Sequence, residues 1–80
     1  MNINQFKSIV AGQIAMHIET IKKAELAGLN DIADGLKKAV KDLQDFLDNT
    51  GRYTVGKALN AGAYIIAKKS TGERVQVISV

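Results

Sequence analysis

The stretch from Leu29 to Leu47 reads LNDIADGLKKAVKDLQDFL and decides the helical part of this 80-residue chain. Its apolar residues recur at steps of four and three, which keeps them on one side of a helix. The series is Leu29, Ala33, Leu36, Val40, Leu43 and Leu47, with Ile32, Ala39 and Phe46 on its flank. This spacing is typical of two helices packed along their length. We expect Asn30 or Asp31 to cap the helix and Gly51 to mark its end.

The preceding segment predicts a second helix with a wider apolar face. Its series is Ile3, Phe6, Val10, Ile14, Ile18, Ile21 and Ala24, widened by Ile9 and Met16. A face this wide indicates contact on more than one side. Gly28 is expected to end the helix, and the loop that follows is short. The two helices should therefore form an antiparallel hairpin over residues 3–48.

The last 30 residues allow two interpretations. Residues 54–62 can form a short helix capped by Thr54. After it, either residues 63–69 and 74–80 form a β-hairpin that turns at Gly72, or the helix continues to Gly72 and leaves one terminal strand. The β-branched pair Ile65-Ile66 favours the β-hairpin. The predicted fold is α+β in a single domain, residues 1–80: an antiparallel two-helix hairpin, a short third helix, and a C-terminal β-hairpin or single strand.

Composition excludes several classes of protein. The chain has no cysteine and one histidine, His17, which excludes disulfides, thiolate metal sites and multi-histidine centres. No apolar run is long enough to span a bilayer, and the N-terminus has no secretory signal pattern. We expect no membrane partner and a cytoplasmic location.

Catalytic motifs are not apparent in the sequence. The carboxylate pairs Glu19/Glu25 and Asp42/Asp45 are expected on solvated helix faces beside lysines, rather than converging on a pocket. The patterns of a serine nucleophile elbow and of a phosphate-binding loop do not occur. We therefore predict a protein that is not an enzyme, with no catalytic, cofactor or metal site.

The charge is uneven along the chain. Residues 1–49 carry a net charge of −1, whereas the basic segment 50–80 carries +4. The five bases of this segment are Arg52, Lys57, Lys68, Lys69 and Arg74, with Tyr53 and Tyr64 interleaved among them. They are either a solvated basic surface or contacts to nucleic acid. In the second interpretation, residues 54–69 form a helix-turn-helix-like unit with the β-hairpin as a wing.

Two segments carry a resemblance to a protein family. Residues 35–40 (GLKKAV), followed by residues 57–69 (KALNAGAYIIAKK), resemble the helix of small bacteriophage neck or tail-completion proteins. Those proteins carry an Ala-Leu-x-Ala-Gly run before a basic helix end. The resemblance implies a phage-encoded virion component that works as a symmetric ring, in the host cytoplasm or the virion. It also implies that residues 63–69 are helical.

The two predicted helices carry more apolar residues than they need to cover each other. We therefore predict a protein-interaction module that forms homo-oligomers or docks on a larger protein. The predicted contact surface comprises the edge of the β-hairpin and the helix residues Phe6, Val10, Ile14, Leu36, Val40 and Leu43. The alternative is a nucleic-acid-binding protein that uses the basic segment.

Overall fold

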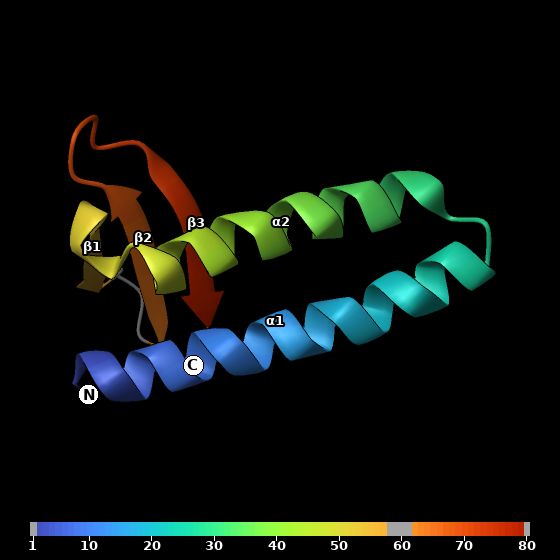
Figure 1. The fold of residues 1–80 in the computed structure, drawn as a ribbon, viewed down its shortest axis with the longest axis horizontal. Coiled ribbons are helices and arrows are strands. Elements are labelled where there is room, and N and C mark those ends of the chain that lie inside the picture. The colour runs from blue at the N-terminus through green and yellow to red at the C-terminus, as the bar shows by residue number, and fades with distance from the viewer. Residues whose placement is uncertain (1, 58–61, 80) are drawn as a thin grey trace.

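The computed structural model describes residues 2–57 and 62–79 and confirms the α+β class. Helices α1 (Ile3–Leu26) and α2 (Asn30–Asp48) form the predicted antiparallel hairpin (Figure 1). A 3-10 turn, η1 (Thr50–Arg52), leads from α2 into a three-stranded sheet. The chain is elongated, with extents of 37 × 24 × 24 Å.

Local hydrogen bonds fix the beginning of α1 and the turn between the helices. The Gln5 backbone N–H donates to the Asn2 side chain at 2.9 Å, and the Asn2 backbone N–H donates to the Gln5 side chain at 3.0 Å. This reciprocal capping box satisfies first-turn donors that have no partner within the helix. At the other end Gly28 has a φ of +75°, as its predicted role as a helix stop requires. The Leu29 N–H donates to the Ala24 carbonyl at 2.8 Å and closes the turn.

The ends of α2 differ from the prediction. Leu29 occupies the N-cap position without a side-chain hydrogen bond, so the cap expected from Asn30 or Asp31 is wrong. At the C-terminus α2 ends at Asp48, and the Thr50 hydroxyl donates to the Phe46 carbonyl at 2.9 Å. Side chains after the helix therefore satisfy its last carbonyl groups, and Gly51 has no left-handed backbone.

The sheet has the order β1-β2-β3, formed by β1 (Tyr53–Lys57), β2 (Ala63–Lys68) and β3 (Arg74–Ser79). Both strand pairs are antiparallel. The predicted β-hairpin is therefore confirmed, and Gly72 turns it with a φ of +73°.

The helical expectations for this part of the chain are corrected. The short helix predicted for residues 54–62 is wrong at Thr54–Lys57, which pair with β2 as a strand, while residues 58–61 lie outside the described part. Residues 63–68 are a strand as well. The helix that the phage resemblance implies for residues 63–69 is therefore not formed, and neither is the helix-turn-helix-like arrangement of residues 54–69.

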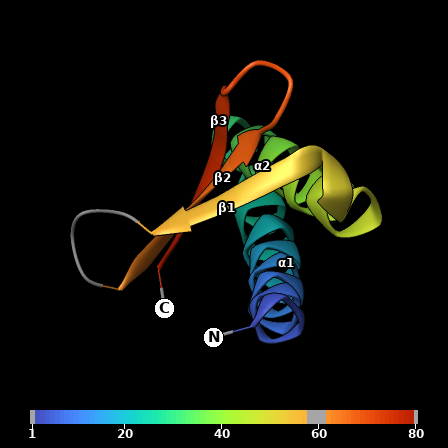
Figure 2. The same cartoon turned by 90° about the vertical axis from the view of Figure 1, so that its left-hand side faces the viewer.

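The main core lies where the sheet crosses one end of the hairpin (Figure 2). Its buried residues are Phe6, Val10, Ile14, Leu43, Phe46, Tyr53, Ile66 and Ile78. Aromatic rings join the layers: Phe6 packs edge-to-face on Phe46, with ring centroids 5.8 Å apart, and contacts Tyr64 at 5.5 Å. The wide face of α1 is thus buried on two sides, by α2 and by the sheet.

A smaller cluster joins the two helices toward their connecting loop. Ile21, Ala24 and Ala33 are buried there, and Leu36 and Val40 pack against them. None of the helices in the described part of the chain is long and apolar enough to cross a membrane.

Candidate functional site

The sheet covers only one half of the helical hairpin. Neighbouring strands lie about 4.8 Å apart, so three strands span roughly 10–15 Å. Helix α1 has 24 residues and is therefore about 36 Å long. The sheet lies across the end of the hairpin that holds the N-terminus of α1, and the hairpin extends well beyond β3 (Figure 1).

On α2, one apolar stripe runs from the covered half into the uncovered half. The residues Ile32, Leu36, Ala39, Leu43 and Phe46 recur at steps of four and three, which places them on one face of the helix. At one end of the stripe, Leu43 and Phe46 are fully buried in the main core. At the other end Ile32 is 52% exposed. The same face of α2 is therefore core under the sheet and surface beyond it.

Helix α1 has a matching stripe. Phe6 and Ile9 pack in the main core, and steps of four and three continue the stripe through Gln13 to Met16 and Thr20. Met16 is 64% exposed. The Thr20 hydroxyl donates to the Met16 carbonyl at 3.1 Å, so it is satisfied within its own helix.

These two stripes define the uncovered face of the hairpin, formed by Met16, Thr20, Ile32, Gly35 and Leu36. Gly35 lies beside Leu36 on α2, and a Cβ atom added there would meet no other atom within 4 Å. These five residues are mainly apolar, and the charged Lys23, which follows Thr20 at the next step of three, borders the face. Because Gly35 has no side chain, another backbone can approach the helix closely at this position, next to the exposed apolar surface.

Four of the six helix residues predicted to contact a partner are not accessible to one. Phe6, Val10, Ile14 and Leu43 are buried in the core of this chain. The sheet and the opposite helix occupy the space that a partner would need. Leu36 and Val40 are half-buried, and Leu36 alone lies on the uncovered face. Sequence reasoning placed Ile32 on the flank of its helix and Met16 as a widening residue, but assigned neither to a contact.

The five predicted nucleic-acid contacts fall into two groups. The strand register places Lys68 opposite Tyr53 and Arg74 opposite Ala67, and the Lys69 N–H donates to the Arg52 carbonyl at 3.0 Å. These contacts bring Arg52, Lys68, Lys69 and Arg74 to one end of the sheet. Lys57 pairs with Tyr64 at the other end.

Acidic side chains accompany the basic end of the sheet. Lys68 forms an ion pair with Glu73, with the charged atoms 3.8 Å apart. A groove beside it is lined by Lys38 and Asp42 of α2 as well as by Lys68, Glu73 and Arg74. The positive potential that phosphates would meet is therefore reduced by two carboxylates.

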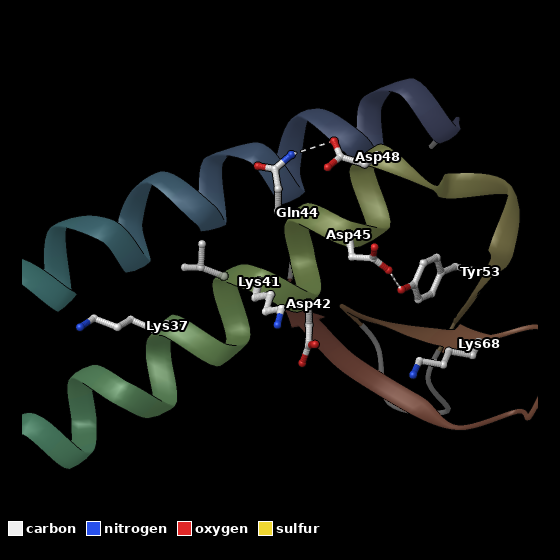
Figure 3. A pocket seen from close by; sticks show the side chains of 9 residues that line it. Lys37, Lys41, Asp42, Gln44, Asp45, Asp48, Tyr53 and Lys68 are labelled. Carbon is white, nitrogen blue, oxygen red and sulfur yellow. Dashed lines mark hydrogen bonds between the residues drawn. The ribbon is translucent and has the colours of Figure 1, made fainter.

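A larger open groove runs between α2 and the beginning of the sheet, with a volume of about 590 Å³ (Figure 3). Its lining includes Lys37, Lys41, Asp42, Asp45, Asp48, Tyr53 and Lys68. The Tyr53 hydroxyl points at Asp45 and donates a hydrogen bond to its carboxylate. That hydrogen bond, together with burial and the negative charges of Asp45 and Asp42, raises the pKa of Tyr53 to about 12.

This Tyr53–Asp45 pair supports a structural role. A tyrosine that acts as a general acid or base needs a pKa near the working pH, and this one is shifted away from it. Its ring packs edge-to-face on Phe46 at 5.7 Å. The pair therefore attaches the first strand of the sheet to α2.

Groups of acidic, histidine or cysteine side chains that could hold a metal ion do not occur among residues 2–57 and 62–79. No protein-family model matches the chain, and the comparisons with curated proteins and with solved structures give no match either.

Proposed function

We propose that this chain is a small, non-enzymatic interaction module that binds a protein through the uncovered face of its hairpin. The observation that carries the proposal is the continuity of the apolar stripe of α2, with the exposed Met16 of α1 beside it. Under the sheet Leu43 and Phe46 are buried, whereas beyond the sheet Ile32 of α2 and Met16 of α1 are exposed to solvent. A partner on the uncovered face buries the apolar residues that the sheet leaves exposed.

The free energy of such binding comes mainly from apolar burial. Covering the exposed halves of Met16 and Ile32 contributes about 1 kcal/mol for each side chain. The Thr20 hydroxyl is already hydrogen-bonded within its helix, so a partner covers it without leaving an unpaired donor. The face can therefore be buried without a large polar desolvation cost.

Site-specific photo-crosslinking in living cells tests this proposal. A photoreactive amino acid at position 32 should give a discrete protein adduct, whereas the same group at Asp34, an exposed position outside the apolar stripe, should not. Met16→Asp places a charge on the uncovered face and should abolish the adduct formed from position 32. Equal adducts from both positions, or an adduct that survives Met16→Asp, would show that the face is not a binding surface.

The gathering of Arg52, Lys68, Lys69 and Arg74 at one end of the sheet supports a second proposal, nucleic-acid binding. Phosphate contacts release counterions, so this binding should weaken steeply as salt is added. Binding through the uncovered face should change little with salt. The double change Lys68→Glu and Lys69→Glu should abolish nucleic-acid binding, and unchanged binding would refute this second proposal.

A further inference from the structure

We infer that the partner on the uncovered face is a second copy of this chain, lying antiparallel to the first as a two-fold dimer. This inference rests on the proposed function, because it names the occupant of the same face. In the dimer the two hairpins stack face to face, α1 against α1 and α2 against α2. The result is a four-helix bundle with one sheet at each end.

The shape of the chain selects the antiparallel arrangement. The sheet forms a second layer over one half of the hairpin only, and the other half is a bare pair of helices (Figures 1 and 2). If two copies stacked in parallel, their sheets would occupy the same space. If they stack antiparallel, the bare half of each copy packs on the bare half of the other, beside the other copy's sheet. The connecting loop of each hairpin then lies near the other copy's β3.

The charges that border the uncovered face on α2 are complementary under this symmetry. Asp31, Gly35 and Lys38 recur at steps of four and three, so both charged residues lie on the edge of the face that contains Gly35. An antiparallel pairing of α2 with its copy, centred next to Gly35, sets Asp31 of each copy opposite Lys38 of the other. Two symmetry-related ion pairs result.

The charges that border the face on α1 show the same arrangement. Glu19 and Lys23 follow Met16 at steps of three and four. Pairing α1 antiparallel with its copy around Ile21 sets Glu19 of each copy opposite Lys23 of the other. Ile21 and Leu36 belong to the same apolar cluster, so the centres of the two pairings lie at similar levels along the hairpin.

Within the single chain Lys23 follows Glu19 by four residues on α1, and Lys38 lines a groove with Asp42 and Glu73, but none of the four side chains lies within ion-pair distance of an opposite charge among the described residues. Among the residues that the structure describes, ion pairs join Lys37 to Glu25 and Lys68 to Glu73, and none involves Glu19, Lys23, Asp31 or Lys38. The two-fold pairing adds an opposite charge from the other copy to each of the four. It also gives Gly35 a role, because a glycine at the centre of the α2 pairing lets the two helices approach closely.

The size of the face indicates a reversible dimer. Stacking covers only the parts of the two helices beyond the sheet, which places the interface at the small end of specific protein contacts. Opposite charges at its edges fix the register and the orientation more than they add affinity. We therefore expect monomer and dimer in an equilibrium that depends on protein concentration.

Sedimentation equilibrium of the purified full chain, from low micromolar to near-millimolar concentration, tests the inference. The unmodified chain should show a monomer–dimer equilibrium. Ile32→Asp should abolish the dimer, because it buries a charge. Asp31→Lys should raise the dimer dissociation constant roughly tenfold, since two symmetry-related pairs change from attraction to repulsion. Combining Asp31→Lys with Lys38→Asp restores opposite charges across the two-fold axis and should restore the dimer.

Asp34→Lys is the matched control, since it makes the same charge change on the same helix outside the apolar stripe. Circular dichroism checks that every variant keeps its fold. A chain that stays monomeric throughout, a dimer that tolerates Ile32→Asp, or equal effects of Asp31→Lys and Asp34→Lys would overturn the inference. A monomeric chain that still gives the crosslinked adduct from position 32 would retain the proposed function with a different partner.

Discussion

The two halves of the hairpin carry the same helical pattern and have different surroundings. Under the sheet, Leu43 and Phe46 of α2 are fully buried. Beyond the sheet, Ile32 belongs to the same stripe and is 52% exposed. Amphipathic spacing therefore specifies which face of a helix is apolar, while the width of the sheet decides how much of that face one chain covers.

Substitutions in the covered half should lower the stability of the chain more than substitutions in the uncovered half. Leu43→Ala removes a fully buried side chain and leaves a cavity, so it should lower the free energy of unfolding by about 3 kcal/mol. Ile32→Ala should cost less than about 1 kcal/mol in solutions dilute enough to dissociate the proposed dimer. Urea unfolding followed by circular dichroism measures both. Equal losses would mean that the uncovered half is buried within the monomer.

A second effect tests how the sheet is attached to the covered half. Tyr53→Phe removes the hydrogen bond to Asp45 and should lower the free energy of unfolding by about 1 kcal/mol. A similar loss from Tyr64→Phe, which removes a tyrosine hydroxyl from the neighbouring strand β2, would contradict a specific role of the Tyr53 hydroxyl.

The pH dependence of this hydrogen bond has a definite sign. The pKa of Tyr53 is raised in the folded chain from 10.0 to about 12, because the protonated hydroxyl donates to Asp45. Its contribution to stability is therefore fully present below pH 10 and is lost as the pH rises through about 12. The difference in unfolding midpoint between the unmodified chain and Tyr53→Phe should shrink over this interval, and a constant difference would refute the assignment.

The smallest of these effects concerns the missing side chain at Gly35 in the uncovered half. Gly35→Ala should stabilise the monomer by about 1 kcal/mol, because alanine favours the helix and a Cβ atom meets no neighbour there. The same change should weaken the dimer, since Gly35 lies at the centre of the proposed α2 pairing. Gly12→Ala on α1 is equally unobstructed and lies in the covered half, so it should stabilise the monomer and leave dimerisation unchanged.

Unfolding at low protein concentration and sedimentation at high concentration separate the two outcomes for Gly35→Ala. A variant that strengthens both folding and association would contradict close helix approach at this position.

Several local features followed from residue types alone. Gly28 ends α1 and Gly72 turns the β-hairpin, both with positive φ values that glycine adopts at low cost. The β-branched pair Ile65-Ile66 correctly favoured strand β2. The capping box of Asn2 and Gln5 also stands in the sequence and was a signal that the prediction did not use.

The errors arose where contacts between distant segments decide. Residues 54–57 were predicted helical from the capping potential of Thr54, yet they pair along β2, and Tyr53 holds the beginning of that strand against Phe46 and Asp45. Likewise, Phe6 and Leu43 were predicted to contact a partner and are covered by this chain's own elements. An apolar stripe does not specify what buries it.

Residue spacing and glycines within a few positions specified the two amphipathic helices and their antiparallel turn, and they favoured the C-terminal β-hairpin over a continued helix. Only the tertiary structure decided that a third strand joins the sheet and that the sheet covers one half of the hairpin. Those outcomes depend on strand pairing and on the mismatch between the width of a three-stranded sheet and the length of a 24-residue helix. That mismatch leaves the uncovered face, on which the proposed function rests.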